Sequence, residues 1–417
     1  MFKETRTLLS ENGGLLACGF LLIFFSGFGQ SVFFGAYLPA IQLDLDLSKT
    51  AIGSIYAAAT VLSSIMIIFS GKGLDVVRLR NFVAVVLLGM ALGCLLMAYA
   101  VNTIILFFAF LLLRHFGQGL STLSAQTSIN RYLDKNRGKA VALISLGGVA
   151  MIAFFPLLAL YLEPHMTWRT AWLYYAAFIF VVLVPSFWLF LRGHQSKTHA
   201  QWEARVKKEQ EERNADALDA FEDEWTRKNV IMNWRFYAIV SLTFLAPFIG
   251  TAVAFYQHDI AESLSITPLA FASSFSLFTL ASLISTLGSG YVIDKYGEKP
   301  VLIAFSFTYA IGLTLLTSGM SLTVVFAGMF LLGGGGGMIG TVGGPLLVQL
   351  YGTKHLGAIK SLLFSTGILS SALSPLMMGY LQDQGIDIMT QFSWFIYYTA
   401  IIWVVAIPLC AKKSKKK

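Results

Sequence analysis

Charged residues are scarce in this sequence. Asp, Glu, Lys and Arg make up 12% of its 417 residues, hydrophobic residues make up 56%, and the mean hydropathy is +0.70. Soluble domains are about half apolar and about a quarter charged, so this composition excludes a soluble enzyme. The net charge of +8 does not indicate nucleic-acid binding, because the basic residues lie between long apolar runs rather than on one accessible face.

Cysteine is also rare. Cys18, Cys94 and Cys410 all lie within apolar segments and have no metal-ligand spacing, so we expect small core residues rather than disulfides or a metal site. The loops contain no glycine-rich phosphate loop, HExxH motif or nucleophile elbow. We therefore expect no enzyme activity, no ATP-driven step and no cofactor.

The apolar residues form about twelve stretches of the roughly 20 residues that a helix needs to cross a bilayer. The first stretch is too long for a cleaved signal peptide. We predict an all-α membrane protein with about twelve transmembrane helices. Their expected ranges are 13–41, 50–70, 81–101, 103–129, 138–162, 167–191, 236–258, 268–293, 300–317, 322–350, 356–381 and 388–409.

The basic residues predict the orientation, because cytoplasmic loops accumulate Lys and Arg. With the amino terminus inside, only Lys49 and Arg169 of the 30 Lys and Arg residues fall outside, and Arg114 falls within a span. Both termini are then cytoplasmic. The basic tail at 412–417 fits an anionic leaflet, and we expect a bacterial inner (plasma) membrane.

One long hydrophilic segment, 192–235, divides the expected spans six and six. Its mixed charges indicate either a solvated, partly helical linker or a regulatory partner site. We predict an amino-terminal half at 1–191, a cytoplasmic linker at 192–235 and a carboxy-terminal half at 236–417.

The two halves share an internal repeat. The ungapped offset that relates Asp75 to Asp294 also relates other Gly, Pro, Ser, Thr and Tyr residues, which shared apolar composition does not explain. These pairs are Ser54 and Ser273, Thr60 and Thr279, Ser63 and Ser282, Gly71 and Gly290, Tyr132 and Tyr351, Gly148 and Gly367, and Pro156 and Pro375. Two six-helix halves related by an axis along the membrane normal follow from this repeat.

The loop residues 290–299, Gly-Tyr-Val-Ile-Asp-Lys-Tyr-Gly-Glu-Lys, resemble a signature of the major facilitator superfamily of secondary transporters, and 71–80 keep its Gly, Asp and final basic residue. Arg114 with Gly117 and Gly119, Arg137 to Ala140, and Trp168 with Arg169 extend the resemblance over nearly the whole chain. Residues 223–237 are similar to the entry into the seventh span of monocarboxylate and oxalate/formate-type carriers. The resemblance implies a carrier that works by alternating access.

Gating residues are predicted in two places. The carboxylates Asp75 and Asp294, with the basic residues Arg80 and Lys295, form either a latch at the cytoplasmic side or static loop-folding pairs. The glycine run bounded by Gly333 and Gly337 indicates either a moving, closely packed helix or static packing.

Arg114 lies about twelve residues into its expected span, which is roughly 18 Å along a helix. An arginine at that depth is a candidate functional residue, and the acidic residues all fall in loops or near span ends. An anionic substrate suits the guanidinium; the alternative is hydrogen bonding to backbone carbonyls and amides. The candidate lining, which the family's use of its first, fourth, seventh and tenth spans implies, is Gln30, Arg114, Gln118, Tyr256 and Gln257.

Gln118 and Ser121 follow Arg114 by four and seven positions, so an α-helix places all three on one face. The candidates for proton coupling are His115, His258 and Asp259. We therefore predict a monomeric carrier of a small organic anion, a carboxylate, with proton symport implied by the family alone. The alternatives are an exporter of amphipathic drugs or siderophore-like compounds and a non-transporting membrane sensor.

Overall fold

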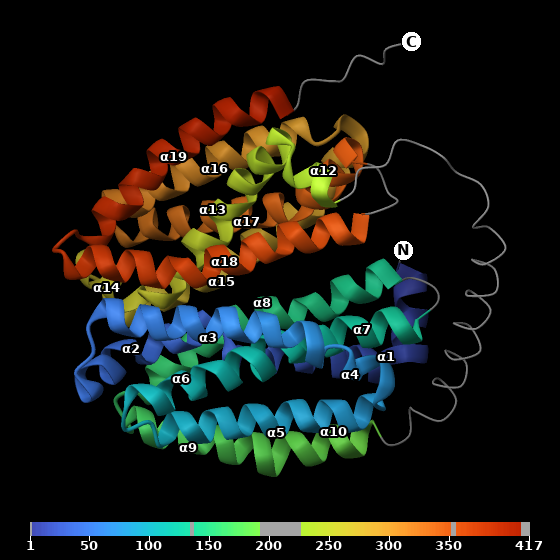
Figure 1. The fold of residues 1–417 in the computed structure, drawn as a ribbon, viewed down its shortest axis with the longest axis vertical. Helices are drawn as coiled ribbons and strands as arrows, with labels where there is room; N and C mark the ends of the chain where they lie inside the picture. Colours follow the sequence, from blue (N-terminus) through green and yellow to red (C-terminus); the bar gives the residue numbers. More distant parts are fainter. Residues whose placement is uncertain (1, 134–136, 192–226, 352–355, 410–417) are drawn as a thin grey trace. The chain divides into compact units, whose positions relative to one another are not determined.

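The computed structural model describes residues 2–133, 137–191, 227–351 and 356–409, and all of its regular elements are helices (Figure 1). Eleven helical stretches in these residues are long and apolar enough to cross a membrane. They match the first eleven expected spans, and the twelfth corresponds to helix α19, Ile388–Leu409. The prediction of an all-α membrane protein is confirmed.

The chain divides into two compact units. Residues 1–41 and 58–222 form the first unit, and residues 42–57 and 223–417 form the second. The expected boundary segment, 192–235, lies largely outside the described residues, so the division at 191 and 236 stays a prediction. The grouping of 42–57 with the second unit was not expected from the sequence.

Three spans of the first unit are interrupted by short segments, η1, η2 and η3. In chain order its helices are α1 (Phe2–Phe25), η1 (Ser26–Gly29), α2 (Ser31–Leu45, of which the last residues belong to the second unit), α3 (Lys49–Ser70, which begins in the second unit), α4 (Gly73–Val76), α5 (Leu79–Ala98), α6 (Thr103–Leu112), η2 (Leu113–Ser121), α7 (Thr122–Tyr132), α8 (Arg137–Leu162), α9 (Trp168–Phe178), η3 (Ile179–Leu183) and α10 (Val184–Phe190).

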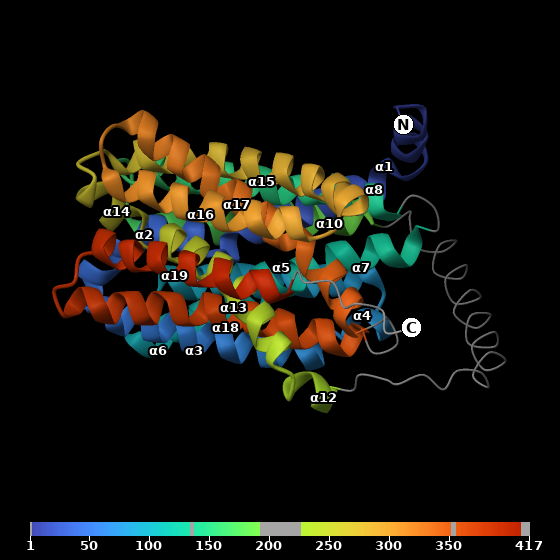
Figure 2. The same cartoon turned by 90° about the horizontal axis from the view of Figure 1, so that it is seen from above.

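The second unit contains longer uninterrupted helices. They are α12 (Arg227–Ile231), α13 (Trp234–Phe255), α14 (Gln257–Ser263), α15 (Pro268–Tyr296), α16 (Lys299–Ser318), α17 (Leu322–Tyr351), α18 (Leu356–Asp383) and α19. Helix α17 packs against both α15 and α16, and α13 packs against α18 (Figure 2).

Polar residues cap several of these helices at their amino ends. The side chains of Asn102, Thr167 and Thr267 accept hydrogen bonds from backbone N–H groups three residues later. Such caps satisfy N–H groups that have no partner within the helix. Gly297, with φ of +80°, ends α15 in a conformation that favours glycine. Local chemistry therefore fixes where these spans begin and end.

The core of the first unit is aromatic. Phe28 and Phe33 contact Phe155 with ring centroids 4.9 and 5.1 Å apart, and Phe33 lies 5.2 Å from Trp172. Edge-to-face contacts of this kind add to the burial of the rings. They join η1 and α2 to α8 and α9, and so fix the break in the first span.

Candidate functional site

The first span is broken where it meets the fourth. A 3₁₀ segment, η1, separates α1 from α2, and the facing part of the fourth span, η2, is π-helical. A Cβ atom on Gly117 would lie 3.0 Å from the Cα and N atoms of Gly29. Two backbones approach this closely only because both residues are glycine. The irregular segments therefore pack directly on each other.

Arg114 lies in this π-helical segment with 3% of its surface exposed. Its Nε donates to the hydroxyl of Thr60 at 3.1 Å, and Nη1 donates to the carbonyl of Gly29 at 3.2 Å. Both acceptors are neutral. The hydrogen bonds fix the direction of the guanidinium and tie it to η1 and α3. The bond to Gly29 is of the kind expected if Arg114 bonds backbone carbonyls instead of an anion.

The prediction of one shared face for Arg114, Gln118 and Ser121 assumed α-helical geometry, which the structure does not have here. A π-helix closes its hydrogen bonds at i→i+5, so offsets of four and seven no longer align as in an α-helix. Ser121 is fully buried and donates to the carbonyl of Leu22 at 2.8 Å, whereas Gln118 is half-buried. Ser121 therefore joins two spans.

Three of the other expected lining residues lie in or next to short segments. Gln30 follows η1 and is half-buried. Tyr256 lies between α13 and α14, where burial raises the pKa of its phenol well above the ordinary value, and it donates to the carbonyl of Pro375. Gln257 is buried and donates to the carbonyl of Ala254 at 3.2 Å. Tyr256 and Gln257 thus take part in hydrogen bonds within the second unit.

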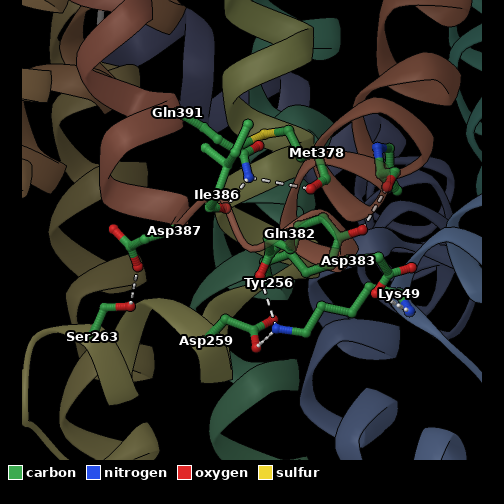
Figure 3. A network of polar contacts seen from close by, with 11 residues as sticks. Lys49, Tyr256, Asp259, Ser263, Met378, Gln382, Asp383, Ile386, Asp387 and Gln391 are labelled. Atoms are coloured by element: carbon green, nitrogen blue, oxygen red, sulfur yellow. Dashed lines mark hydrogen bonds and ion pairs between the residues drawn. The ribbon is translucent and has the colours of Figure 1, made fainter.

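A polar network surrounds the start of α3 in the second unit (Figure 3). The Lys49 ammonium pairs with the carboxylate of Asp259 and donates to the amide oxygen of Gln382 at 2.8 Å. Asp383, at the end of α18, accepts from the backbone N–H groups of Lys49 at 3.2 Å and Thr50 at 2.7 Å, and from the Thr50 hydroxyl. The sequence had suggested Asp259 as a coupling residue but had given no role to Asp383.

The proton-coupling candidates occupy different surroundings. His115 is 2% exposed, and its Nδ1 atom has no hydrogen-bond partner among the described residues. His258 and Asp259 are half-buried in α14, outside the spanning helices, and Asp259 forms the ion pair with Lys49. Within the described part of the chain, no group of three or more His, Cys, Asp or Glu residues is arranged to hold a metal ion.

The predicted latch residues are placed as follows. The side chain of Asp75 lies outside the described residues. The Arg80 guanidinium lies 3.6 Å from the centre of the Trp188 ring, which is a cation–π contact. Asp294 is exposed and forms no ion pair with a described residue, and Lys295 lies 5.1 Å from the centre of the Tyr296 ring. The latch stays a prediction.

The glycine run lies in a continuous helix, α17. A Cβ atom on Gly333 would meet the carbonyl of Phe278, and one on Gly337 would meet that of Ser282. Both glycines therefore allow close backbone packing against α15. A Cβ atom on Gly334 would meet nothing within 4 Å. The glycine run therefore packs against α15 at Gly333 and Gly337 but not at Gly334. Movement of the helix stays a prediction.

Arg131 is a residue that sequence reasoning missed. It is 7% exposed at the end of α7, and its Nη1 donates to the carbonyl of Leu74 at 2.6 Å. This bond holds the signature loop 71–80 against the fourth span. Its position at the end of a span, among other basic residues, gave no sign of this bond.

Comparison with known protein families gives a match over most of the chain. The model of the Major Facilitator Superfamily matches residues 19–259 and 239–416. No curated protein matches. The chain belongs to the Major Facilitator Superfamily, a family of transporters rather than enzymes, and is a multi-pass integral membrane protein.

Several solved structures share the fold at low sequence identity. The crystal structure of a D-xylose-proton symporter has a TM-score of 0.72 and 16% identity, over 95% of this chain and 97% of that one. The nucleoside transporter NupG has a TM-score of 0.69 and 13% identity, over 96% and 100%. A bacterial homolog of the human lysosomal transporter Spinster, inward-facing and occupied, has a TM-score of 0.67 and 11% identity, over 94% and 96%.

Proposed function

We propose that this chain is a secondary transporter that moves a small organic anion, a carboxylate, by alternating access, with Arg114 as the cation that binds it. The observation that supports the proposal is a buried guanidinium in a π-helical segment packed on the break in the first span. Broken helices near the bilayer midplane are typical of binding sites in secondary transporters, and π-helical segments are frequent at functional sites.

Arginine suits this role because of its shape as well as its charge. The guanidinium carries five N–H donors in a planar fork, and a carboxylate binds such a fork at two points. Thr60 and Gly29 orient the group through neutral acceptors, so they leave its positive charge unchanged. Attraction between opposite charges is stronger in a buried site than in water.

The remaining features of the proposal concern the surroundings of Arg114. Gln30, Gln118, Tyr256 and Gln257 are the proposed lining, and His115 is the proton-coupling candidate adjacent to Arg114 in sequence.

We propose a monomer with both termini in the cytoplasm of a bacterial cell. The division into halves at 1–191 and 236–417, joined by a cytoplasmic linker, belongs to the same proposal.

The test is counterflow in proteoliposomes that contain the purified protein, with labelled formate, lactate and oxalate beside D-xylose and a nucleoside. We expect carboxylate exchange in the wild type and at least a tenfold loss in both Arg114→Gln and Arg114→Lys, because a point charge does not reproduce the fork. Arg169→Gln is the control, because Arg169 lies at the start of α9 rather than in η2 and donates to the carbonyl of Ala100 at 2.7 Å.

The outcomes separate the proposal from its rivals. If the wild type exchanges a neutral solute and Arg114→Gln exchanges it equally well, the substrate is not an anion bound by Arg114. Binding of a carboxylate without exchange would favour a sensor. Exchange of amphipathic drugs with no competition by anions would favour the exporter.

A further inference from the structure

A cavity of about 590 Å³ lies in the second unit, where the end of α14, the end of α16 and the start of α19 meet. Pockets for small organic molecules have volumes of about 300–1,000 Å³, whereas one water molecule takes up about 30 Å³. The cavity is therefore the right size for a small organic ligand and too large for a single ion. In the proposed orientation, this end of the unit faces the cell exterior.

Three hydroxyl groups on the cavity wall have already used their hydrogen atoms. Ser263 donates to the carboxylate of Asp387 at 3.2 Å (Figure 3). Thr317 and Ser318 donate to backbone carbonyls of their own helix at 2.9 and 2.8 Å. A hydroxyl group has one hydrogen to donate and two lone pairs to accept with. These groups therefore offer acceptors to the cavity, and a ligand must supply the donors.

Asp387 is the carboxylate of this cavity, and its charge is not neutralised by a described residue. Its Oδ1 accepts from Ser263, and its Oδ2 accepts from the backbone N–H groups of Met389 at 2.9 Å and Thr390 at 3.2 Å. All three donors are neutral. A carboxylate has about four acceptor positions, so Asp387 keeps both its negative charge and acceptor capacity for a ligand.

The helix ends at the cavity add to its negative character. Helix α16 has 20 residues and ends at Ser318, and Gly319 follows it with φ of +59°. The last carbonyl groups of a helix carry a partial negative charge that favours a nearby cation. Neither α14 nor α16 has a basic residue in its last turn. These two helices therefore supply no cation of their own at the cavity.

A second cavity, of about 270 Å³, adjoins the first, because Ser263 and Asp387 line both. It brings one cation, Lys49, whose ammonium is paired with Asp259. It also brings the exposed carboxylate of Glu262, which forms no ion pair with a described residue. The two cavities together therefore have an excess of negative charge.

We propose that the larger cavity binds an organic ammonium ion, a primary amine with a short alkyl body. An ammonium group has three donors and no acceptor, which matches the Asp387 carboxylate and the hydroxyl oxygens around it. Leu264 and Met389 line the same cavity and provide an apolar surface for the alkyl part. Glu262 strengthens the attraction from the adjoining cavity. The inference goes beyond the proposed transport function and does not depend on Arg114.

The first experiment locates the ligand. In a background with Cys18, Cys94 and Cys410 replaced by Ala, a fluorine label is attached to Met320→Cys, next to Gly319, where the native side chain is 80% exposed. Butylamine, 1-butanol and butyrate are titrated at neutral pH and constant ionic strength. We expect a saturable shift of the fluorine NMR signal with butylamine alone. The same label at Lys299→Cys, at the other end of α16, keeps its signal.

The second experiment removes the charges. Asp387→Asn keeps a side chain that caps α19, because asparagine caps helices as well as aspartate does, and Glu262→Gln changes an exposed side chain. We expect the apparent Kd for butylamine to rise about tenfold in Asp387→Asn, since a charge-assisted hydrogen bond is lost, and further in the double variant. Glu298→Gln, at the other end of α16, is the control and leaves the Kd within about twofold.

Each result decides the inference. It is overturned if butylamine gives no saturable shift at Met320→Cys, if 1-butanol gives the same shift, or if the double variant binds butylamine as tightly as the unchanged protein. A selective shift that weakens in Asp387→Asn and in the double variant supports it. None of these measurements needs transport, so a failure of carboxylate counterflow overturns the proposed function and leaves this test intact.

Discussion

Arg114 and Thr60 are joined by a hydrogen bond of 3.1 Å from the guanidinium Nε to the threonine hydroxyl, and both residues are buried. Thr60 lies ten residues after Thr50 in the same helix, which is about 15 Å along α3. The proposed anion site and the polar network around Lys49 are therefore attached to one continuous helix. The Arg114 side chain is thus linked through Thr60 to the helix whose first backbone N–H groups Asp383 caps.

Thr60→Val tests the bond to Arg114. The substitution keeps the shape but removes the acceptor, and leaving a buried charged donor unsatisfied costs about 1–3 kcal/mol or more. We expect a lower thermal unfolding midpoint in detergent and weaker stabilisation by the transported carboxylate. Thr60→Ser keeps the hydroxyl and is the control. Equal unfolding midpoints for Thr60→Val and Thr60→Ser would show that the bond contributes nothing.

His115→Gln tests proton coupling. His115 is buried next to Arg114 in the chain, and histidine is the side chain most often used to carry a proton near neutral pH. We expect the variant to lose uphill accumulation driven by a proton gradient, while carboxylate counterflow stays within twofold of the wild type. His165→Gln is the control, because His165 is exposed and bonds the carbonyl of Tyr161. If His115→Gln accumulates the carboxylate as well as the wild type does, a residue other than His115 carries the proton.

Much of the fold could be predicted from the sequence, because spans are set by local composition and caps. Helix α16, Lys299–Ser318, matches the expected range 300–317 closely, with a proline at its start and Gly319 at its end. The helix break at Ser26–Gly29 was not predicted, since no proline marks it. It depends on the contact between Gly29 and Gly117, which are far apart in sequence.

The candidate site was predicted only in part, for a similar reason. The burial of Arg114 follows from its depth in an apolar run, but the π-helical backbone around it depends on packing. Asp383 looked like one more acidic residue in a loop, because nothing local shows that it caps a helix more than three hundred residues away. The matched pair of Thr60 and Thr279 was the one sequence signal that pointed to Thr60.

Tyr37 and Tyr175 allow a double-mutant cycle in the aromatic core. Their hydroxyl groups share a hydrogen bond of 2.7 Å, and both side chains are buried. Replacing one tyrosine by phenylalanine leaves the other hydroxyl without this partner, at a cost of about 1–3 kcal/mol. We expect the double variant to lose less stability than the two single variants added together. Additive losses in thermal unfolding would mean that the bond contributes little.

Gly337 and Gly334 make a matched pair within the glycine run of α17. Alanine at 337 places a Cβ atom against the backbone carbonyl of Ser282, and overpacking of this kind costs about 1–3 kcal/mol. Alanine at 334 meets nothing within 4 Å and gains up to about 1 kcal/mol of helix propensity. We therefore expect Gly337→Ala to lower the unfolding midpoint and Gly334→Ala to keep or raise it. Because both are Gly→Ala changes in one helix, they differ chiefly in what the added methyl meets, so equal midpoints would contradict close packing of α17 on α15.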